Sequence, residues 1–303
     1  MYQSRRTFIK KSGLALAGAS LASGQLFSFA KSEGILGIQL YTVRDAMTKD
    51  ALGSLKKLAA MGYQNVEHAN YKERKFYGYG AGEFKKILAD MGMKMPSGHT
   101  VLGKQHWDEA KKDFTDAWKY TVEDAATAGQ QYVISPSLDA SLYQSEDSLL
   151  HFLEVFNKSG ELCKKSGMKF GYHNHHFEFA KKVNGKILYD LILDNTDPKL
   201  VVQQLDTGNL FNAGVKAIDI VKKFPGRFEL MHVKDEIAAA KPNGEEKFES
   251  AVLGKGIAQV KEVIDLGKAA GTKQFIVEQE AYQGTDPFDC AKEDFEAMKK
   301  WGY

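Results

Sequence analysis

Short apolar runs alternate with amphipathic stretches along the chain after Ala30. The apolar runs predict β-strands at residues 35–41, 64–68, 94–100, 131–135, 169–173, 201–206, 229–234 and 274–280. Between them, apolar residues recur at three- and four-residue steps, as in Leu52, Leu55 and Leu58, which is typical of a helix with one buried face. Gly62 and Gly129 follow such stretches, where a left-handed cap is expected. Eight strand-then-helix units predict an α/β fold with a single (β/α)8 TIM barrel.

The alternative arrangement is an open, doubly wound sheet with helices on both faces. No glycine-rich phosphate-binding motif follows the first predicted strand, which weighs against the dinucleotide-binding form of that fold. No low-complexity linker interrupts residues 31–303, so we expect one domain there. The polar stretch 237–258 is expected to form a long loop over the open end of the barrel.

The first thirty residues have the pattern of an export signal. Arg5 and Arg6 form a twin-arginine sequence, and an apolar stretch from Gly13 to Ala22 follows. The small residues that a signal peptidase recognises then occur directly before the expected cleavage site, which follows Ala30. The apolar stretch is too short to span a bilayer core of about 30 Å. These features predict a Tat-type signal peptide over residues 1–30, cleaved near Ala30. The mature protein is then expected to be periplasmic, with no membrane attachment.

Composition narrows the classes of function. The chain has 303 residues, with 41 Lys and Arg against 39 Asp and Glu, a net charge of +2. We therefore expect no nucleic-acid partner and no anionic-membrane surface, and export argues against phosphorylated metabolites. Two cysteines, Cys163 and Cys290, are too few for a disulfide scaffold or a cysteine-built zinc site, and we expect two free thiols.

Potential metal ligands occur at the ends of the last four predicted strands. In a TIM barrel the reacting residues come from the C-terminal ends of the strands. His173, Asp206, His232 and Glu278 each follow a strand-like run, at equivalent places in successive repeats. Two imidazoles and two carboxylates suit one divalent ion such as Mn, Co, Zn, Ni or Fe better than Mg or Ca. A histidine alone at a strand end is more often a hydrogen-bonded structural group than a ligand, and Asp206 alone is also explained as a turn cap.

Several short motifs resemble those of the xylose isomerase-like TIM barrels, the sugar phosphate isomerase/epimerase superfamily. They are Gly37-Ile38-Gln39-Leu40-Tyr41-Thr42, Tyr172-His173-Asn174-His175, Leu205-Asp206-Thr207-Gly208-Asn209, His232-Val233-Lys234-Asp235, Leu253-Gly254-Lys255-Gly256 and Val277-Glu278-Gln279-Glu280. Their order and spacing extend over most of residues 31–303. The resemblance implies a barrel enzyme acting on a sugar, with His173, Asp206, His232 and Glu278 as metal ligands.

The fifth predicted strand departs from the better-known epimerases of this family. In those enzymes two glutamates, on the fifth and eighth strands, exchange the substrate's proton. Here His173 stands at the first position and Glu278 is retained at the second. The Tyr-His-x-His pattern instead resembles the inosose dehydratase branch, in which a keto sugar loses a β-substituent. The DNA-repair endonuclease branch fits poorly, because Asn209 stands where it needs a further histidine.

Further residues near the same strand ends are candidates for acting on the substrate. A base must reach the proton beside the carbonyl, and the candidates are Glu278, by the resemblance, and His175, two residues beyond His173. Lys234 is a candidate for stabilising an oxyanion. Structural explanations for the last two are a ligand-orienting contact and an ion pair. Side chains expected to contact the sugar are Gln39, Tyr41, Glu67, His99, Trp107, Asn209 and Glu280.

These observations predict a divalent-metal-dependent sugar isomerase or epimerase that forms an enediolate from an unphosphorylated keto sugar. The alternative is a lyase that acts on 3-keto-glycosides or keto sugars by the same enolate chemistry followed by β-elimination. Export and the histidine at position 173 favour the lyase. A non-catalytic exported sugar-binding protein is the third hypothesis. The expected partner is a small sugar or glycoside, and surface helices such as the one ending at Trp301 could pack in a homodimer.

Overall fold

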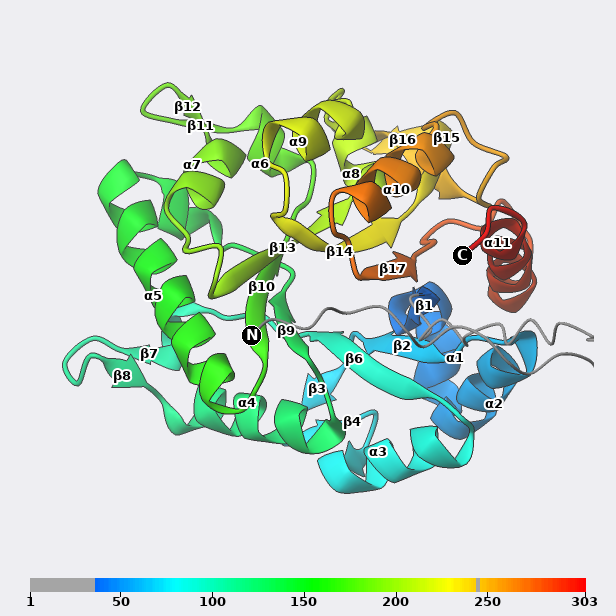
Figure 1. The fold of residues 1–303 in the computed structure, drawn as a ribbon, viewed down its shortest axis with the longest axis horizontal. Helices are drawn as coiled ribbons and strands as arrows, with labels where there is room; N and C mark the ends of the chain where they lie inside the picture. The colour runs from blue at the N-terminus through cyan, green and yellow to red at the C-terminus, as the bar shows by residue number, and fades with distance from the viewer. Residues whose placement is uncertain (1–35, 244–245) are drawn as a thin grey trace, which may run out of the picture. The chain divides into compact units, whose positions relative to one another are not determined.

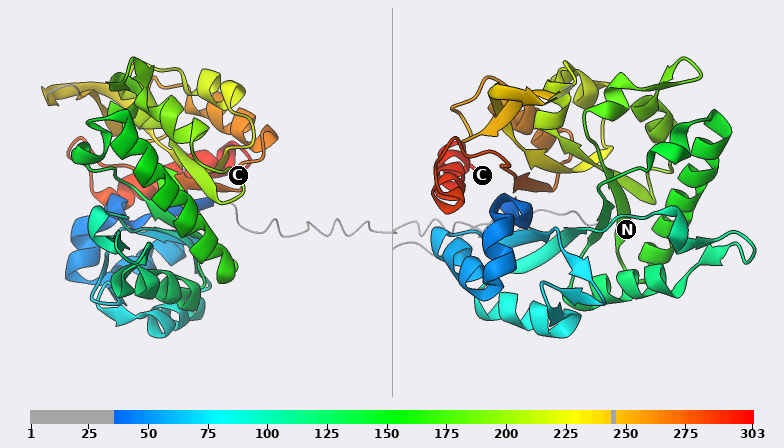
Figure 2. Two further views of the ribbon diagram at one scale, coloured as in Figure 1. Left: turned by 90° about the vertical axis from the view of Figure 1, so that its left-hand side faces the viewer. Right: turned by 180° about the vertical axis from the view of Figure 1, so that it is seen from behind.

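Eight parallel strands close into a barrel in the computed structural model, which describes residues 36–243 and 246–303 (Figures 1 and 2). In order around the barrel they are β1 (Leu36–Gln39), β17 (Gln274–Val277), β14 (Phe228–Val233), β13 (Val201–Asp206), β10 (Lys169–His173), β9 (Tyr132–Ser135), β6 (Lys94–His99) and β2 (Asn65–His68). Each strand pairs in parallel with its two neighbours. The predicted TIM barrel is therefore confirmed. The predicted signal peptide lies outside the described residues.

Helices follow the strands and surround the barrel in Figure 2. The α-helices are α1 (Arg44–Lys49), α2 (Ala51–Met61), α3 (Ala81–Asp90), α4 (Asp116–Ala128), α5 (Glu146–Lys165), α6 (Phe177–Ala180), α7 (Leu188–Asp194), α8 (Thr207–Asn212), α9 (Ala217–Lys223), α10 (Val260–Ala269) and α11 (Pro287–Lys300). Gly62 (φ 109°) and Gly129 (φ 88°) end α2 and α4 in the left-handed conformation, as expected from the sequence.

Alternate residues of each strand share one face, and this period of two builds the inside of the barrel in layers. Tyr132, Ile134, Val202, Leu230 and Ile276 come from four strands and form one buried apolar cluster. Two residues further along the chain from Val202, Leu230 and Ile276, a polar side chain stands in place of an apolar one: Gln204 in β13, His232 in β14 and Glu278 directly after β17. A polar layer at the C-terminal end of the barrel thus rests on an apolar layer.

The stretch 237–258 is not the long loop that its polarity suggested. Much of it belongs to an antiparallel hairpin of β15 (Asp235–Asn243) and β16 (Glu246–Ala251). Ser250 Oγ accepts hydrogen bonds from the backbone N–H groups of Glu280 and Ala281, which ties the hairpin to the segment after β17. The sequence has an Asn-Gly dipeptide at 243–244, a pair typical of hairpin turns, and this signal could have predicted the hairpin.

Shorter strands form three further small sheets outside the barrel. They are β3 (Tyr71–Lys72), β4 (Lys75–Phe76) and β5 (Tyr79–Gly80); β7 (Trp107–Asp108) and β8 (Asp113–Phe114); and β11 (Lys182–Val183) and β12 (Lys186–Ile187). Single turns of 3-10 helix are η1 (Leu40–Val43), η2 (Lys104–His106) and η3 (Ala140–Tyr143). Both cysteines are buried free thiols, as expected. Within the described ranges, no helix combines the length and apolarity that crossing a membrane requires.

Candidate metal centre

The four side chains expected to bind a metal come from four adjacent strands. His173 ends β10, Asp206 ends β13, His232 lies in β14 and Glu278 directly follows β17. Asp206 Oδ2 lies 3.8 Å from His232 Nδ1 and 3.9 Å from His173 Nε2. Glu278 Oε2 lies 3.0 Å from His232 Nδ1. All four side chains are buried, so their polar atoms face one small space at the C-terminal end of the barrel.

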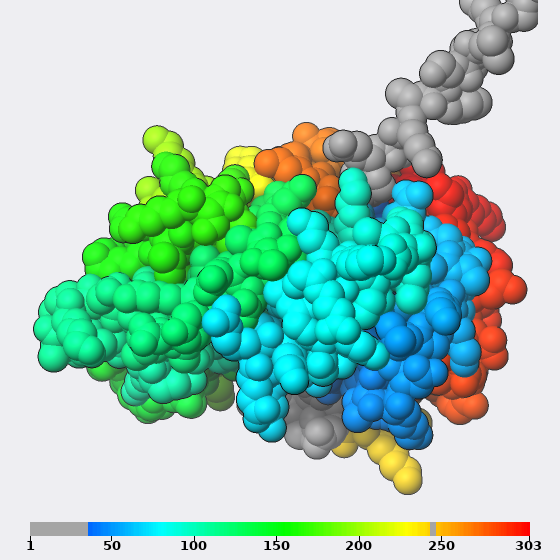
Figure 3. All heavy atoms as spheres, turned by 90° about the horizontal axis from the view of Figure 1, so that it is seen from below, coloured from blue at the N-terminus to red at the C-terminus, as the bar shows by residue number. Residues whose placement is uncertain are grey.

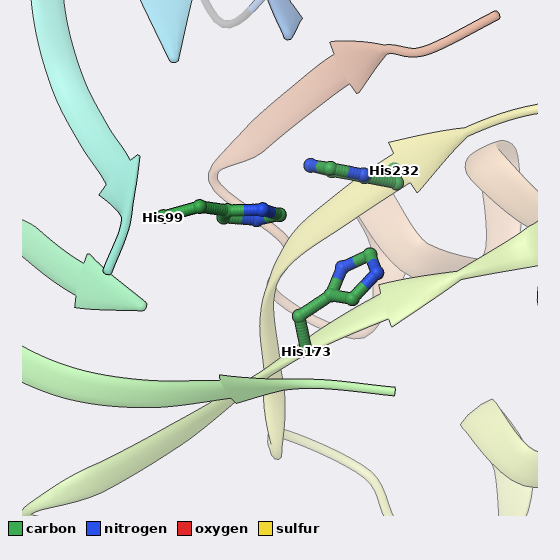
Figure 4. A group of neighbouring side chains, drawn as sticks. All are labelled: His99, His173 and His232. Atoms are coloured by element: carbon green, nitrogen blue, oxygen red, sulfur yellow. The ribbon is translucent and has the colours of Figure 1, made fainter. Parts of the chain in front are cut away.

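Two overlapping groups of side chains meet the geometric condition for holding an ion. Asp206, His232 and Glu278 each offer a ligand atom, and these atoms lie within 4.8 Å of one another. His99, His173 and His232 form the second group, whose rings are shown in Figure 4. The His99 and His232 rings stack with their centroids 5.1 Å apart, and the His173 centroid lies 4.7 Å from that of His232. His232 belongs to both groups.

Glu67 determines which nitrogen of His232 faces the other ligands. Glu67 Oε1 lies 2.6 Å from His232 Nε2, and it also accepts a hydrogen bond of 2.7 Å from Gln39 Nε2. Burial raises the pKa of Glu67, but His99 and His232 outweigh burial and hold it well below its usual range. An ionised carboxylate only accepts hydrogen bonds, so His232 donates from Nε2. A neutral His232 then has its lone pair on Nδ1, the nitrogen that faces Glu278.

Gln204 fixes His173 in the same way. Its Nε2 donates to Glu67 Oε2 at 2.8 Å, and its Oε1 accepts from His173 Nδ1 at 2.9 Å and from His99 Nε2 at 2.7 Å. A neutral His173 therefore has its lone pair on Nε2, the nitrogen that faces Asp206. Gln204 was not among the residues predicted from the sequence. The sequence signal for its role was a long polar side chain in β13, a strand whose two neighbouring strands are buried.

When His232 is neutral, the arrangement brings four acceptor atoms together. The atoms are His173 Nε2, His232 Nδ1, Asp206 Oδ2 and Glu278 Oε2, and Asp206 Oδ2 accepts no hydrogen bond from the described residues. Metal-binding histidines characteristically donate their other ring N–H to a carboxylate or carbonyl oxygen, as both histidines do here. Burial lowers the pKa of His232, but Glu278 and Glu67 outweigh burial and raise it to about 10. The site thus demands a positive charge, and its donor set fits a divalent ion.

Lys234 supplies a fixed positive charge at the same place. Its Nζ lies 2.8 Å from Glu278 Oε2, 3.2 Å from Asp206 Oδ2 and 3.5 Å from Glu280 Oε2. Burial lowers the pKa of Lys234, but the carboxylates outweigh burial and hold it well above its usual range. The ammonium group therefore stays charged in a buried position, where it offsets part of the repulsion between Asp206 and Glu278.

His175 lies beside the four ligands even though β10 ends at His173. The centroids of the His173 and His175 rings are 5.1 Å apart. The His175 backbone N–H donates to Glu178 Oε2 at 2.9 Å. His175 Nδ1 is buried and has no hydrogen-bond partner among the described residues. Burial is the main cause that lowers the pKa of His175 to about 4, so the ring is neutral at neutral pH.

The residues expected to contact sugar divide into two sets. Glu67, Gln39 and His99 are joined to the ligands through the hydrogen bonds described above. Asn209 supports a candidate ligand, because its backbone N–H donates to Asp206 Oδ1 at 2.7 Å. Glu280 contacts Lys234, as given above.

Tyr41 and Trp107 lie apart from this network. Tyr41 is 42% exposed, with the Arg44 guanidinium 4.6 Å from its ring centroid. Trp107 packs on Phe114 and donates from Nε1 to Glu109 Oε2, so its contacts are within the β7–β8 hairpin and the loop joining its strands. That hairpin projects at the left of Figures 1 and 3, and the contacts given for Trp107 are not with the four candidate ligands.

Comparison with known proteins agrees with this architecture. A family model described as xylose isomerase-like TIM barrel matches residues 55–301. An inosose dehydratase of Clostridium perfringens is 27% identical over 192 residues, which span 60% of this chain and 62% of the relative, so less than two thirds of that protein is matched. A sugar phosphate isomerase/epimerase structure from Parabacteroides distasonis has 25% identity and a TM-score of 0.74, covering 89% of this chain and 95% of the other.

The fold extends to more distant enzymes. The structure of an L-ribulose 3-epimerase has a TM-score of 0.64 at 12% identity, covering 88% of this chain and 93% of the other, and this similarity concerns the fold alone. The residues matched by the family model contain every barrel strand except β1, together with the four strand ends of the candidate metal centre. The chain belongs to the xylose isomerase-like TIM-barrel family.

Proposed function

We propose that this chain is a divalent-metal-dependent enzyme that removes the proton beside the carbonyl of an unphosphorylated keto sugar. The observation that carries the proposal is the set of facing acceptor atoms on His173, Asp206, His232 and Glu278. The relatives named inosose dehydratase and sugar phosphate isomerase/epimerase support a sugar or polyol-derived ketone as the substrate.

A divalent ion bound by these residues supplies the polarisation of a ketone oxygen, which makes the neighbouring C–H more acidic. The protein must then take the proton and stabilise the negative charge that develops on the substrate. Lys234 holds a buried ammonium group 2.8 Å from Glu278 Oε2 and is suited to the second task. Its charge is already desolvated, so it interacts strongly with an oxyanion.

His175 is our candidate for the base that takes the proton. A general base needs a free lone pair within reach of the reacting C–H. The buried Nδ1 of His175 has no hydrogen-bond partner among the described residues, and its ring adjoins that of His173. Glu278 is the second candidate for the base. Its carboxylate lies beside His232 Nδ1, whereas Glu67 lies beside His232 Nε2.

The reaction is proposed to end in β-elimination. Two-base epimerisation needs a carboxylate facing Glu278 across the substrate, and the fifth strand ends in His173 there. Glu67 does not replace it, because both its oxygens are engaged by Gln39, Gln204 and His232. One base and a leaving group suffice for a dehydratase or lyase, and relatives from Clostridium perfringens and Geobacillus thermodenitrificans are named inosose dehydratase. In an isomerase or epimerase the same enolate would take up a proton again, with no group expelled.

Proton NMR in D₂O tests this proposal. The manganese-loaded protein is incubated with a 3-keto-β-glucoside and, separately, with a free 3-keto-hexose. We expect release of the alcohol from the glucoside with appearance of an unsaturated ketone, and His175→Gln is expected to slow release at least a hundredfold. Deuterium uptake beside the carbonyl without alcohol release would favour epimerisation. Binding of either sugar with neither reaction would indicate a sugar-binding protein and contradict the proposal.

We further propose that the protein is exported through the twin-arginine signal in residues 1–30. The support is the order of charged, apolar and small residues in the sequence. In a bacterial host, the wild-type chain is expected in the periplasmic fraction, and the variant with Arg5→Lys and Arg6→Lys is expected to remain in the cytoplasm. Equal fractionation of the two chains would contradict this route.

A further inference from the structure

A cavity of about 600 Å³ lies beside the metal centre at the C-terminal end of the barrel. Its wall combines the segment after β2, the segment after β6 and one side of α4. His99 belongs to this wall and also to the histidine group shown in Figure 4. His99 thus connects the cavity wall to the candidate metal centre. The cavity volume falls in the usual range of roughly 300–1,000 Å³ for ligand pockets.

The cavity carries exposed apolar surface. Among the residues that the structure describes, four large apolar or aromatic side chains are exposed, and two of them line this cavity: Val101 at 44% and Tyr120 at 43%. Exposed apolar groups gathered in a hollow next to polar side chains are typical of ligand sites. An aromatic ring of this kind suits stacking against a sugar ring or an aromatic group.

The aromatic wall is held by a charged contact. The Arg74 guanidinium lies 4.2 Å from the centroid of the Tyr120 ring, and Arg74 Nη2 bonds Asp124 Oδ1 at 2.7 Å. Glu73 and Arg74 both have positive φ, 52° and 62°, in the turn between β3 and β4. This backbone conformation costs energy for residues other than glycine, so the contact with Asp124 helps to hold the turn against that cost.

We propose that this cavity binds the part of the substrate beyond the keto ring, so that the substrate is a glycoside with a sugar or aromatic aglycone. The inference rests on the proposed function, because a β-elimination needs a leaving group next to the metal centre. In a 3-keto-glycoside the proton leaves C2 to the base, the C1–O bond breaks as the C1–C2 double bond forms, and the leaving oxygen takes a proton. The aglycone departs as an alcohol, and no oxidant or reductant is required.

A second cavity provides a matched control. It lies between α8, α9 and α10, and Ile257 in its wall is 57% exposed. None of its lining residues is an imidazole or carboxylate of the metal centre. Ile257→Ser therefore removes exposed apolar surface of a similar kind without touching the proposed aglycone site.

The test compares two substrates in the manganese-loaded protein, methyl 3-keto-β-D-glucopyranoside and its 4-nitrophenyl analogue. Tyr120→Ala and Val101→Ser are expected to raise the KM for the 4-nitrophenyl substrate at least fivefold. They should change kcat/KM for the methyl substrate less than twofold, and Ile257→Ser should change neither. An equal effect on both substrates, or no effect on either, would overturn the aglycone site.

A binding measurement separates this proposal from the proposed function. Calorimetry with 4-nitrophenyl β-D-glucopyranoside, which lacks the ketone, reports on the cavity without turnover. Weaker binding to Tyr120→Ala than to the wild type supports the aglycone site. If neither keto substrate reacts, that result refutes the elimination but not the site. Identical binding to both proteins refutes the site, whatever the activity.

Discussion

Glu67 Oε1 lies 2.6 Å from His232 Nε2, although the two residues are 165 positions apart in the sequence. Their strands, β2 and β14, are not neighbours in the barrel, so the contact crosses its interior. Through this contact Glu67 directs the other ring nitrogen of His232 toward Glu278 and Asp206. Glu67, which was expected to contact sugar, therefore also orients a candidate metal ligand.

Replacing Glu67 by Gln is expected to weaken binding of Mn²⁺ by roughly 10–100-fold. The amide no longer enforces one tautomer of His232, and it also lacks the negative charge that strengthens the imidazole as a ligand. Competition with a metal-binding dye measures the affinity. Glu280→Gln is the control, because Glu280 is 48% exposed and contacts Lys234 at 3.5 Å, and its affinity should change less than threefold. Equal affinities of Glu67→Gln and the wild type would contradict the orienting role.

Two adjacent glutamines on β13 are expected to respond in opposite ways to substitution by Leu. Gln204 bridges Glu67, His99 and His173, so Gln204→Leu leaves buried polar groups unpaired and should lower the free energy of unfolding by roughly 2–4 kcal/mol. Gln203 is also buried, but neither polar atom of its side chain has a hydrogen-bond partner among the described residues. Gln203→Leu should therefore be neutral or stabilising. Urea unfolding compares the two, and similar losses of stability would show that the bridge has no special importance.

Lys234→Met should destabilise the metal-free protein by roughly 3–5 kcal/mol, because it leaves Asp206 and Glu278 without their fixed positive neighbour. A bound divalent ion restores positive charge at these carboxylates. The increase in Tm on adding saturating Mn²⁺ is therefore expected to be larger in the variant than in the wild type. A variant that gains no more than the wild type would indicate that the ion and the ammonium group act at different places.

A carboxyl group remote from the barrel opening should govern part of the pH dependence of stability. Asp294 in α11 accepts a hydrogen bond from the Leu253 backbone N–H at 2.8 Å, and burial raises its pKa to about 7. The unfolded value is about 3.9, so the folded state holds the proton more tightly. This contribution to stability is complete below about pH 4 and is lost as pH rises through 7.

Asp294→Asn removes that titration while keeping an oxygen for the Leu253 N–H. Urea unfolding between pH 5 and pH 8 should therefore show a smaller loss of stability in the variant, by at most about 3 kcal/mol. Asp289→Asn, on the exposed side of the same helix, is the control and should keep the wild-type slope. Parallel pH profiles for the wild type and Asp294→Asn would refute the assignment.

The barrel was predictable because parallel strands are buried on both faces and read as continuous apolar runs. The ends of the runs were less certain. The apolar run at 274–280 ends as a strand at Val277, because the segment after it turns to bond Ser250 of the β15–β16 hairpin. Glu280 reaches Lys234 from this segment. Glu280 therefore lies near the candidate metal centre because of this turn, and not because alternate residues of a strand share a face.

The four proposed ligands were predictable because equivalent positions of the repeat meet at one end of the barrel. Glu67 and Gln204 were not recognisable as their supports, since hydrogen bonds across the barrel interior leave no periodic pattern in the sequence. The predicted role of Trp107 in binding sugar stays a prediction, and the structure gives this residue a packing role. An aromatic residue near a strand end suggested a sugar platform, but the β7–β8 hairpin uses it to pack on Phe114.

Elemental analysis of the purified protein, with three variants beside it, tests the central claim most directly. One transition-metal ion per chain is expected in the wild type, and it should be lost in His232→Ala and Glu278→Ala. His99→Ala should retain the ion, because His99 contacts Glu67 and Gln204 and belongs only to the second group of histidines. A wild-type protein that holds no metal after reconstitution with Mn, Co, Ni or Zn would contradict the proposed metal centre and the chemistry built on it.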